Sequence, residues 1–242
     1  MGSYTFYTAG ETAALCRAIT LLQQAGITFA PTPGSHITHL LLPIPSLLPD
    51  GTIRGGEDFY QLLKKLPQDI SIIGGNLPAL PQYKVIDLLQ DPIYVAENAY
   101  ITAHCAIRLM MEKLPTSLRN CKILVIGWGR IGKCLATLLK QMEADVTVAA
   151  RKETDRAILS ALGYHTIHPE ETGDYRVIFN TVPAPVACNC NSSCLKIDLA
   201  SVQGISCSDV IHATGLPGKD APEASGNLIS KTILRLLKEE CL

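Results

Sequence analysis

The chain has 242 residues, of which 47% are hydrophobic and 18% are charged, and its net charge at neutral pH is −1. This composition is typical of a globular protein with a sizeable core, and the balanced charge argues against nucleic acid or an anionic membrane as a partner. The N-terminus lacks the basic and apolar regions of a targeting signal, and the most apolar stretch, residues 40–48, is too short to span a bilayer. We therefore expect a cytoplasmic protein without membrane segments.

The first part of the chain alternates between strand and helix patterns. Strands are predicted over 4–8, 27–30, 39–43, 69–73 and 83–88. One helix is predicted with Ala14, Leu15, Ala18, Ile19 and Leu22 on its apolar face, and another over 57–66. A capping box of Thr8 and Glu11 is expected to start the first helix, and Gly26 to end it. Alternation of this kind predicts a parallel sheet, so residues 1–93 are expected to form a small N-terminal α/β domain of the flavodoxin-like type.

A glycine-rich turn dominates the second part of the chain. An apolar strand over 122–126 leads into Gly127-Trp-Gly129-Arg-Ile-Gly132, then a helical pattern and a second strand over 145–150. Gly127 allows the chain to leave the strand tightly, Gly129 allows the backbone to approach a pyrophosphate, and Gly132 allows the helix to pack close to the strand. The pyrophosphate is expected to lie at the positive N-terminus of that helix. In this context the glycine pattern predicts a dinucleotide site.

The remaining elements complete a second sheet. A helix over 155–162 and strands over 164–167, 177–180, 195–200 and 209–213 are expected. The predicted fold class is α/β, with a Rossmann-type parallel-sheet domain over residues 94–220, including a linking helix over 97–114, besides the smaller N-terminal domain. A last helix over 221–240 is expected to pack back on the N-terminal domain.

The end of the second strand of the nucleotide unit bears on the choice of cofactor. An acidic residue normally stands there when the ribose hydroxyl of NAD is bound, whereas this chain has Arg151 and Lys152. Guanidinium groups bind phosphate strongly, so NADP is favoured and NAD stays possible. The alternative is a solvated pair of cations, with Glu153 beside them.

Further site residues follow from the loops at strand ends. The residues expected to bind the cofactor are Gly127, Trp128, Gly129, Arg130, Ile131, Gly132, Arg151, Lys152, Asn180, Thr181, Val182 and Pro183. Those expected to line a substrate pocket are Gly75, Asn76, Thr102, Ser201, Leu216, Pro217 and Gly218. His104 is a candidate proton carrier, or else a histidine on a helix surface, and Arg54 is a candidate clamp for a carboxylate.

The nine cysteines are an odd number spread over a long chain, which favours reduced thiols. The local cluster Cys188, Cys190 and Cys194 does not have the paired spacing of a zinc ribbon, so no metal is expected.

Taken together, these segments resemble the family of dipicolinate synthase A subunits. The motifs that carry the resemblance are Val125-Ile-Gly-Trp-Gly-Arg-Ile-Gly132, Val146-Thr-Val-Ala-Ala-Arg151, Phe179-Asn-Thr-Val-Pro183, Ile197-Asp-Leu-Ala-Ser201 and Gly215-Leu-Pro-Gly-Lys-Asp-Ala-Pro222. The match is strong from about residue 94 onward and looser before it, where Leu41-Leu-Pro-Ile-Pro45 and Gly74-Gly75-Asn76 fit.

The resemblance implies an NADP-dependent oxidoreductase subunit. It would act on a small dicarboxylate, oxidising a dihydrodipicolinate-type intermediate to dipicolinate for spore formation, with a flavoprotein-like B subunit as partner. A homo-oligomer is also expected. The family usually reads Pro-Thr-Ala-Glu-Gly where this chain has Ile101-Thr-Ala-His-Cys105, so His104 replaces a carboxylate.

Two alternatives stay open. One is another dehydrogenase on the same scaffold, such as a 2-hydroxyacid dehydrogenase. That class needs an Arg, a carboxylate and a His at fixed places after the nucleotide unit, and His212 is the only histidine late enough in the chain. The other is a non-catalytic subunit that binds a nucleotide without turnover.

Overall fold

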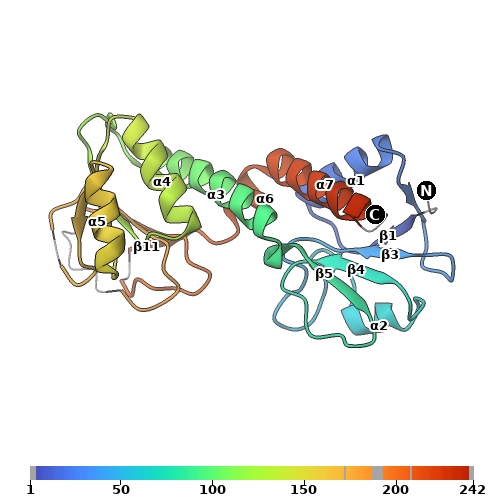
Figure 1. The fold of residues 1–242 in the computed structure, drawn as a ribbon. Helices are drawn as coiled ribbons and strands as arrows, with labels where there is room; N and C mark the ends of the chain where they lie inside the picture. The colour runs from blue at the N-terminus through green and yellow to red at the C-terminus, as the bar shows by residue number, and fades with distance from the viewer. Residues whose placement is uncertain (1–3, 172, 187–192, 208, 240–242) are drawn as a thin grey trace. The chain divides into compact units, whose positions relative to one another are not determined.

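The computed structural model describes residues 4–171, 173–186, 193–207 and 209–239 of the chain (Figure 1). The chain divides into two compact units. The first unit comprises Met1–Asn98 together with Pro217–Leu242, and the second comprises Ala99–Leu216.

The first unit contains a five-stranded parallel sheet in the order β2-β1-β3-β4-β5. Its strands are β1 (Thr5–Thr8), β2 (Thr28–Phe29), β3 (His39–Leu41), β4 (Ser71–Gly74) and β5 (Lys84–Asp87). This is the flavodoxin-like strand order. The central strands β3 and β4 are buried throughout, as expected for a sheet covered on both faces.

The helices of this unit begin where local capping allows. They are α1 (Ala13–Gln24), α2 (Phe59–Leu63), the 3-10 helix η1 (Leu88–Gln90) and α7 (Pro222–Glu239). The predicted capping box at Thr8 is wrong. Thr12 caps α1, its hydroxyl accepting from the Leu15 N–H (3.2 Å), while the Thr8 hydroxyl donates to the Leu41 carbonyl of β3 (3.1 Å).

Helix α7 packs against α1 although more than 190 residues separate them in the chain (Figure 1). Gly226 allows this close approach, since a Cβ there would lie 2.5 Å from the Arg17 Cβ and 2.7 Å from the Ala14 carbonyl oxygen. Helix α6 (Leu216–Asp220) precedes α7 and contains Leu216, Pro217 and Gly218, three of the residues expected to line a substrate pocket.

Helix α3 (Pro92–Lys113) begins five residues before the predicted start at Glu97. The Asp91 carboxylate accepts from the Tyr94 N–H (2.7 Å), and Pro92 at the first helical position needs no partner for a backbone N–H. The α3 residues Ala103, Ala106, Ile107 and Met110 are buried, as is Leu114 directly after the helix.

The second unit contains a six-stranded parallel sheet in the order β11-β10-β9-β6-β7-β8. Its strands are β6 (Lys122–Ile126), β7 (Asp145–Ala149), β8 (His165–Ile167), β9 (Val177–Asn180), β10 (Leu195–Asp198) and β11 (Val210–His212). Helices α4 (Arg130–Gln141) and α5 (Glu153–Ala161) connect β6, β7 and β8. Numbered within the unit, this is the Rossmann order 6-5-4-1-2-3, so the predicted fold class is confirmed.

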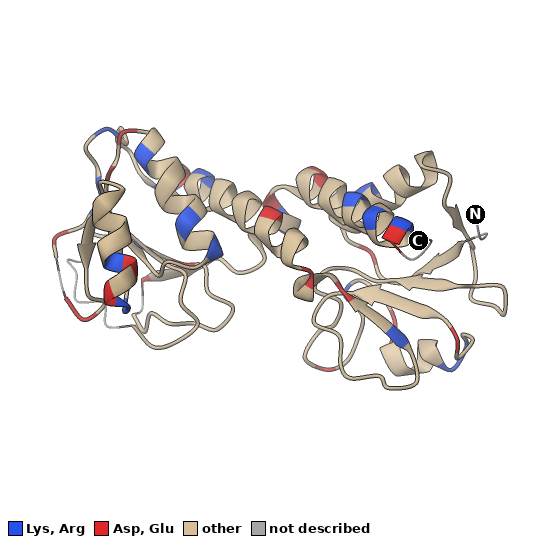
Figure 2. Ribbon diagram, in the orientation of Figure 1, with Lys and Arg blue, Asp and Glu red and all other residues tan. Residues whose placement is uncertain are grey.

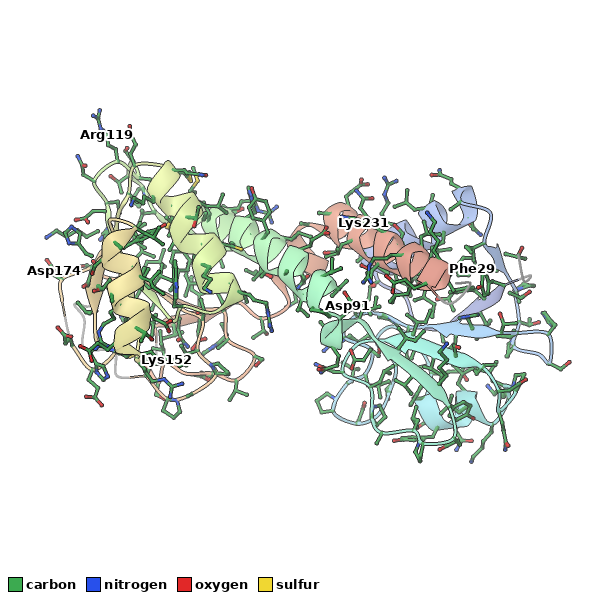
Figure 3. All side chains as sticks on the ribbon, in the orientation of Figure 1. Phe29, Asp91, Arg119, Lys152, Asp174 and Lys231 are labelled. Atoms are coloured by element: carbon green, nitrogen blue, oxygen red, sulfur yellow. The ribbon has the colours of Figure 1, made fainter. Side chains whose placement is uncertain are left out.

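Two ion pairs hold α7 to the segment around the start of α3. Arg235 contacts Asp91 (2.6 Å), whose side chain is only 13% exposed, and Lys231 contacts Glu97 (2.6 Å) at a more exposed position (Figure 3). Burial by itself would raise the pKa of Asp91, but hydrogen bonds from the Tyr94 N–H and from Arg235, together with the charge of Arg235, lower this pKa below its usual value.

We predict that Asp91→Asn lowers the free energy of unfolding by about 1–2 kcal/mol at pH 7, because asparagine still caps α3 but cannot pair with Arg235. The pKa of Asp91 is lower in the folded protein, so its stabilisation is present above about pH 4, the pKa of an unfolded aspartate, and is lost as the pH falls through the folded value. Urea unfolding at several pH values should therefore show the difference from wild type shrinking in acid. Glu97→Gln is the matched control and should cost under about 0.5 kcal/mol. Equal losses for both variants would contradict the prediction.

Candidate dinucleotide and substrate site

The glycine-rich turn of the second unit connects β6 to α4. Gly127 has a φ of +104°, and a Cβ there would lie 2.5 Å from the Thr181 hydroxyl oxygen. A Cβ on Gly132 would lie 2.1 Å from the Gly127 carbonyl oxygen, so glycine is required for α4 to start this close to the strand. Gly129 differs from both, because a Cβ there would meet no described atom within 4 Å. The chain itself thus requires Gly127 and Gly132, whereas the space beside Gly129 is open.

The N-terminus of α4 is suited to an anion. Its N-cap is Gly129, so no side chain bonds to the first-turn N–H groups there. Free N–H groups and the positive end of the helix dipole favour a phosphate at such a place. Open space at Gly129 and an uncapped helix start fit a dinucleotide pyrophosphate. Of the predicted neighbours, Arg130 is exposed and Ile131 half-buried.

Trp128 lies in the same turn and is the single tryptophan of the chain. Its ring meets the edge of Tyr164 (centroids 5.9 Å apart), and the Lys133 Nζ lies 5.7 Å from its centre. The half-buried indole is therefore held by neighbouring side chains beside the expected pyrophosphate position.

Three cations meet at the carboxyl end of β7. Arg151 and Lys152 are exposed, and Lys152 is the N-cap of α5 (Figure 3). Arg156, which the sequence interpretation missed, donates from Nη1 to the carbonyls of Ala150 (2.7 Å) and Arg151 (2.8 Å). Its signal was present in the sequence as a third cation one turn beyond Lys152. Both charge signs occur at this end of α5, since Glu153 and Asp155 lie in its first turn (Figure 2).

A buried polar network shapes the loops after β9 and β10. The Asp198 carboxylate, 1% exposed, accepts four hydrogen bonds of 2.9–3.1 Å, from the Asn180 side chain and from the N–H groups of Ala200, Gly204 and Ile205. Asn180, fully buried, also bonds to both backbone groups of Val182 (3.0 Å each). The Asn180 side chain therefore hydrogen-bonds to the backbone of the turn that follows it.

The outer residues of these loops have different exposure. The Thr181 hydroxyl donates to the Ile126 carbonyl (2.9 Å), Val182 is half-buried, and Pro183 and Ser201 are exposed. From the sequence, Asp198 was noted only within the motif Ile197-Asp-Leu-Ala-Ser201 and was given no role. The signal for its loop-shaping role was an acidic residue at the end of a buried parallel strand.

At the carboxyl edge of the first unit's sheet, the loop carrying Arg54 is locked to the turn after β1. The Glu11 N–H donates to the Arg54 carbonyl (3.2 Å), and the Arg54 N–H to the Ser46 carbonyl (3.0 Å). Gly10 and Gly55 both have positive φ, and a Cβ on either would lie within 2.5 Å of backbone across this contact. The Arg54 Nε is buried and has no hydrogen-bond partner among the described residues. An unpaired buried donor is costly, so an anion bound there would stabilise it.

Ser46 ties the end of β4 to this edge. Its hydroxyl donates to the Pro43 carbonyl (2.9 Å) and accepts from the Gly75 N–H (2.9 Å). Asn76 follows, exposed and with a φ of 55°. Gly75, Asn76 and Arg54 therefore follow strands, or loops tied to strands, at one edge of this sheet.

The other predicted pocket residues are spread over both units. Thr102 is buried on α3 in the second unit, and Leu216, at the end of that unit, is buried too. Pro217 and Gly218 are the first residues of the returning segment of the first unit, and a Cβ on Gly218 would meet nothing within 4 Å.

His104 lies on α3 beside the C-terminal end of α4. It is exposed, meets the edge of the Tyr100 ring (centroids 4.6 Å apart) and shares a groove with Leu138 and Met142. The glycine-rich turn is at the opposite end of α4, about 15 Å away at 1.5 Å per helical residue. The structure thus does not bring His104 to the expected pyrophosphate position.

Neither a metal cluster nor a membrane span was found in the part of the chain that the structure describes. No group of three or more His, Cys, Asp or Glu residues suited to a metal occurs there, and no described helix is long and apolar enough to cross a bilayer. Cys188 and Cys190 lie outside the described residues. Burial raises the pKa of the Cys121 and Cys134 thiols, so neither is a thiolate at neutral pH.

Comparison with known proteins connects this architecture to one group of relatives. No protein-family model matches the chain. The chain is 24% identical over 240 residues to the A subunit of dipicolinate synthase from Bacillus subtilis (strain 168), covering 86% of this chain and 80% of the relative.

Solved structures with a similar fold cover nearly all of the chain. The crystal structure of the dipicolinate synthase A chain from Bacillus subtilis has a TM-score of 0.83 at 20% identity, covering 99% of this chain and 97% of that one. The A subunit from Bacillus halodurans also has a TM-score of 0.83, at 19% identity, covering 97% and 98%. An L-alanine dehydrogenase has the same general fold, with a TM-score of 0.63 at 12% identity over 98% of this chain and 81% of that one. The resemblance to the family of dipicolinate synthase A subunits is therefore confirmed, and the solved structures share the fold of this chain.

Proposed function

We propose that this protein is a dipicolinate synthase A-type subunit that oxidises a dihydrodipicolinate-type dicarboxylate with NADP. The observation that carries the proposal is the turn at residues 127–132, where Gly127 and Gly132 are required by close packing while Gly129 borders open space at an uncapped helix start. The resemblance to the A subunit of dipicolinate synthase supports the choice of substrate.

The chemistry that the cofactor supplies is the acceptance of a hydride by its oxidised nicotinamide. A dihydropyridine dicarboxylate loses one hydride and one proton and becomes an aromatic pyridine, so the products are dipicolinate, NADPH and a proton. The residues of this chain bind and orient the reactants. The first-turn N–H groups of α4 hold the pyrophosphate, and the turn at Thr181–Pro183, shaped by Asn180 and Asp198, borders the cofactor.

Arg54 is the residue that we assign to a substrate carboxylate. Its Nε is buried without a partner among the described residues, on a loop locked in place by Gly10 and Gly55. A guanidinium on a rigid loop binds a carboxylate through paired N–H donors, which a lysine cannot reproduce.

The proposal also includes the biological setting. A flavoprotein-like B subunit is the expected partner, spore formation the process and the cytoplasm the compartment. A nucleotide-binding subunit without turnover is the second candidate. It is favoured by one observation, the position of His104 at the far end of α4 from the glycine-rich turn.

Turnover and binding together test the proposal. We expect freshly made dihydrodipicolinate and NADP+ to yield NADPH and dipicolinate, measured by absorbance, alone or with the B-type subunit. We also expect NADPH to quench the fluorescence of Trp128, since this tryptophan lies in the pyrophosphate turn. Quenching without turnover, both with and without the B-type subunit, would favour the second candidate. The absence of quenching and of turnover would contradict a dinucleotide site.

Arg151→Ala tests the choice between NADP and NAD. The loss of a charge-assisted contact with the 2′-phosphate should raise the Kd of NADPH about tenfold or more, roughly 1.4 kcal/mol, and change that of NADH less than about twofold. Fluorescence titration of Trp128 measures both. Arg119→Ala is the matched control, because Arg119 is exposed and precedes β6, at the amino ends of the strands of the same sheet, whereas Arg151 follows the carboxyl end of β7 (Figure 3). Equal weakening of NADPH and NADH would contradict the assignment.

Arg54→Lys and Arg54→Ala test the carboxylate contact. Both should raise the KM of the dicarboxylate, by about 10- to 100-fold for alanine, because charge-assisted hydrogen bonds of about 1.5–3 kcal/mol are lost. The Kd of NADPH should stay unchanged in both. Lys64→Ala, an exposed cation of the same unit, is the control and should leave KM at the wild-type value. An unchanged KM in Arg54→Ala would remove Arg54 from the substrate site.

A further inference from the structure

An apolar groove of the second unit lies between α3 and the C-terminal end of α4. It has a volume of about 650 Å³. It is lined by the apolar side chains of Ile107, Met111, Leu138 and Met142 and by the polar side chains of His104, Arg108, Glu112 and Gln141. None of the contacts assigned above to the cofactor or to the substrate involves this groove.

Large apolar side chains are exposed along it. Met111 is 52% exposed and Met142 is 38% exposed. Tyr100, 50% exposed, continues the surface along α3 through its contact with His104. Contiguous apolar exposure of this kind marks an interaction site, and methionine side chains adapt readily to a partner surface.

The charges on the groove edge are balanced and paired. Arg108 and Glu112 are one helical turn apart, 3.5 Å from each other, and each is more than half exposed. One cation and one anion give this edge no net charge. It therefore does not complement a strongly acidic or basic partner, nor an anionic membrane, which would require a basic face.

The same pair is complementary to itself under two-fold symmetry. When two copies of α3 cross antiparallel about an axis level with residue 110, Arg108 of each copy faces Glu112 of the other. Met111 then lies next to the axis and contacts its counterpart, which covers the apolar lining of the groove on both copies. Helix α3 has 22 residues and is about 33 Å long, enough to support such a crossing.

We infer that the α3–α4 groove is the interface of a two-fold dimer of this chain, with Met111 at the axis and Arg108–Glu112 contacts on either side. The interface is independent of the cofactor and substrate proposals, because it uses the end of α4 that lies away from the glycine-rich turn.

Sedimentation velocity over about 0.1–100 μM protein tests this inference. Wild type should dimerise, and Met111→Glu should raise the dimer Kd about 100-fold or more, because two carboxylates would be buried at the axis. Ile158→Glu is the matched control: Ile158 is 55% exposed on α5, outside the groove, and its replacement should leave the dimer intact. A wild type that stays monomeric at 100 μM, or a Met111→Glu variant that dimerises like wild type, would overturn the inference.

A charge exchange tests the two-fold geometry itself. Arg108→Glu places glutamates opposite each other across the axis, and Glu112→Arg does the same with arginines, so each variant alone should dimerise about tenfold or more weakly. An equimolar mixture should form heterodimers as tightly as wild type, since each glutamate of one copy then faces an arginine of the other. Recovery in the mixture also shows that both variants are folded. Failure of the mixture to recover would exclude this arrangement.

Discussion

The second unit depends on the contact between the start of α4 and the end of β6. Gly132 lies so close to the Gly127 carbonyl that any Cβ would be 2.1 Å from it, and Gly127 itself has a positive φ. Because α4 begins directly over the strand end, its first N–H groups lie at the carboxyl edge of the sheet, where ligands bind in open α/β sheets. The cofactor proposal follows from this single packing constraint.

The buried Asn180–Asp198 network extends the same edge. A carboxylate that is 1% exposed can be kept there because four N–H groups hydrogen-bond to it. One belongs to the Asn180 side chain at the end of β9, and three are backbone N–H groups of the loop after β10. The network fixes the turn after β9 and the loop after β10 relative to each other. The residues assigned to the cofactor from sequence therefore have different surroundings. Asn180 is buried and supports the turn after β9, whereas Arg151 and Lys152 are exposed.

Two local predictions were wrong for a common reason. The pattern at Thr8 and Glu11 had the composition of a capping box, but β1 continues through Thr8 and its hydroxyl bonds to β3, so Thr12 caps the helix. Helix α3 starts early because Asp91 both caps it and pairs with Arg235 of α7. In each case a residue distant in the chain decided between local conformations of similar free energy.

The sequence by itself determined the two parallel sheets, their strands and the glycine-rich turn, because strand and helix periodicity and the steric demands of Gly127 and Gly132 are local properties. Only the tertiary structure decided which polar residues are satisfied inside the protein. It shows Asn180 used within its turn, Arg156 bonded to the end of β7, the Arg54 Nε without a partner among the described residues, and His104 in the α3–α4 groove. Hydrogen bonding and burial depend on neighbours brought together by folding, and no spacing along the chain encodes them.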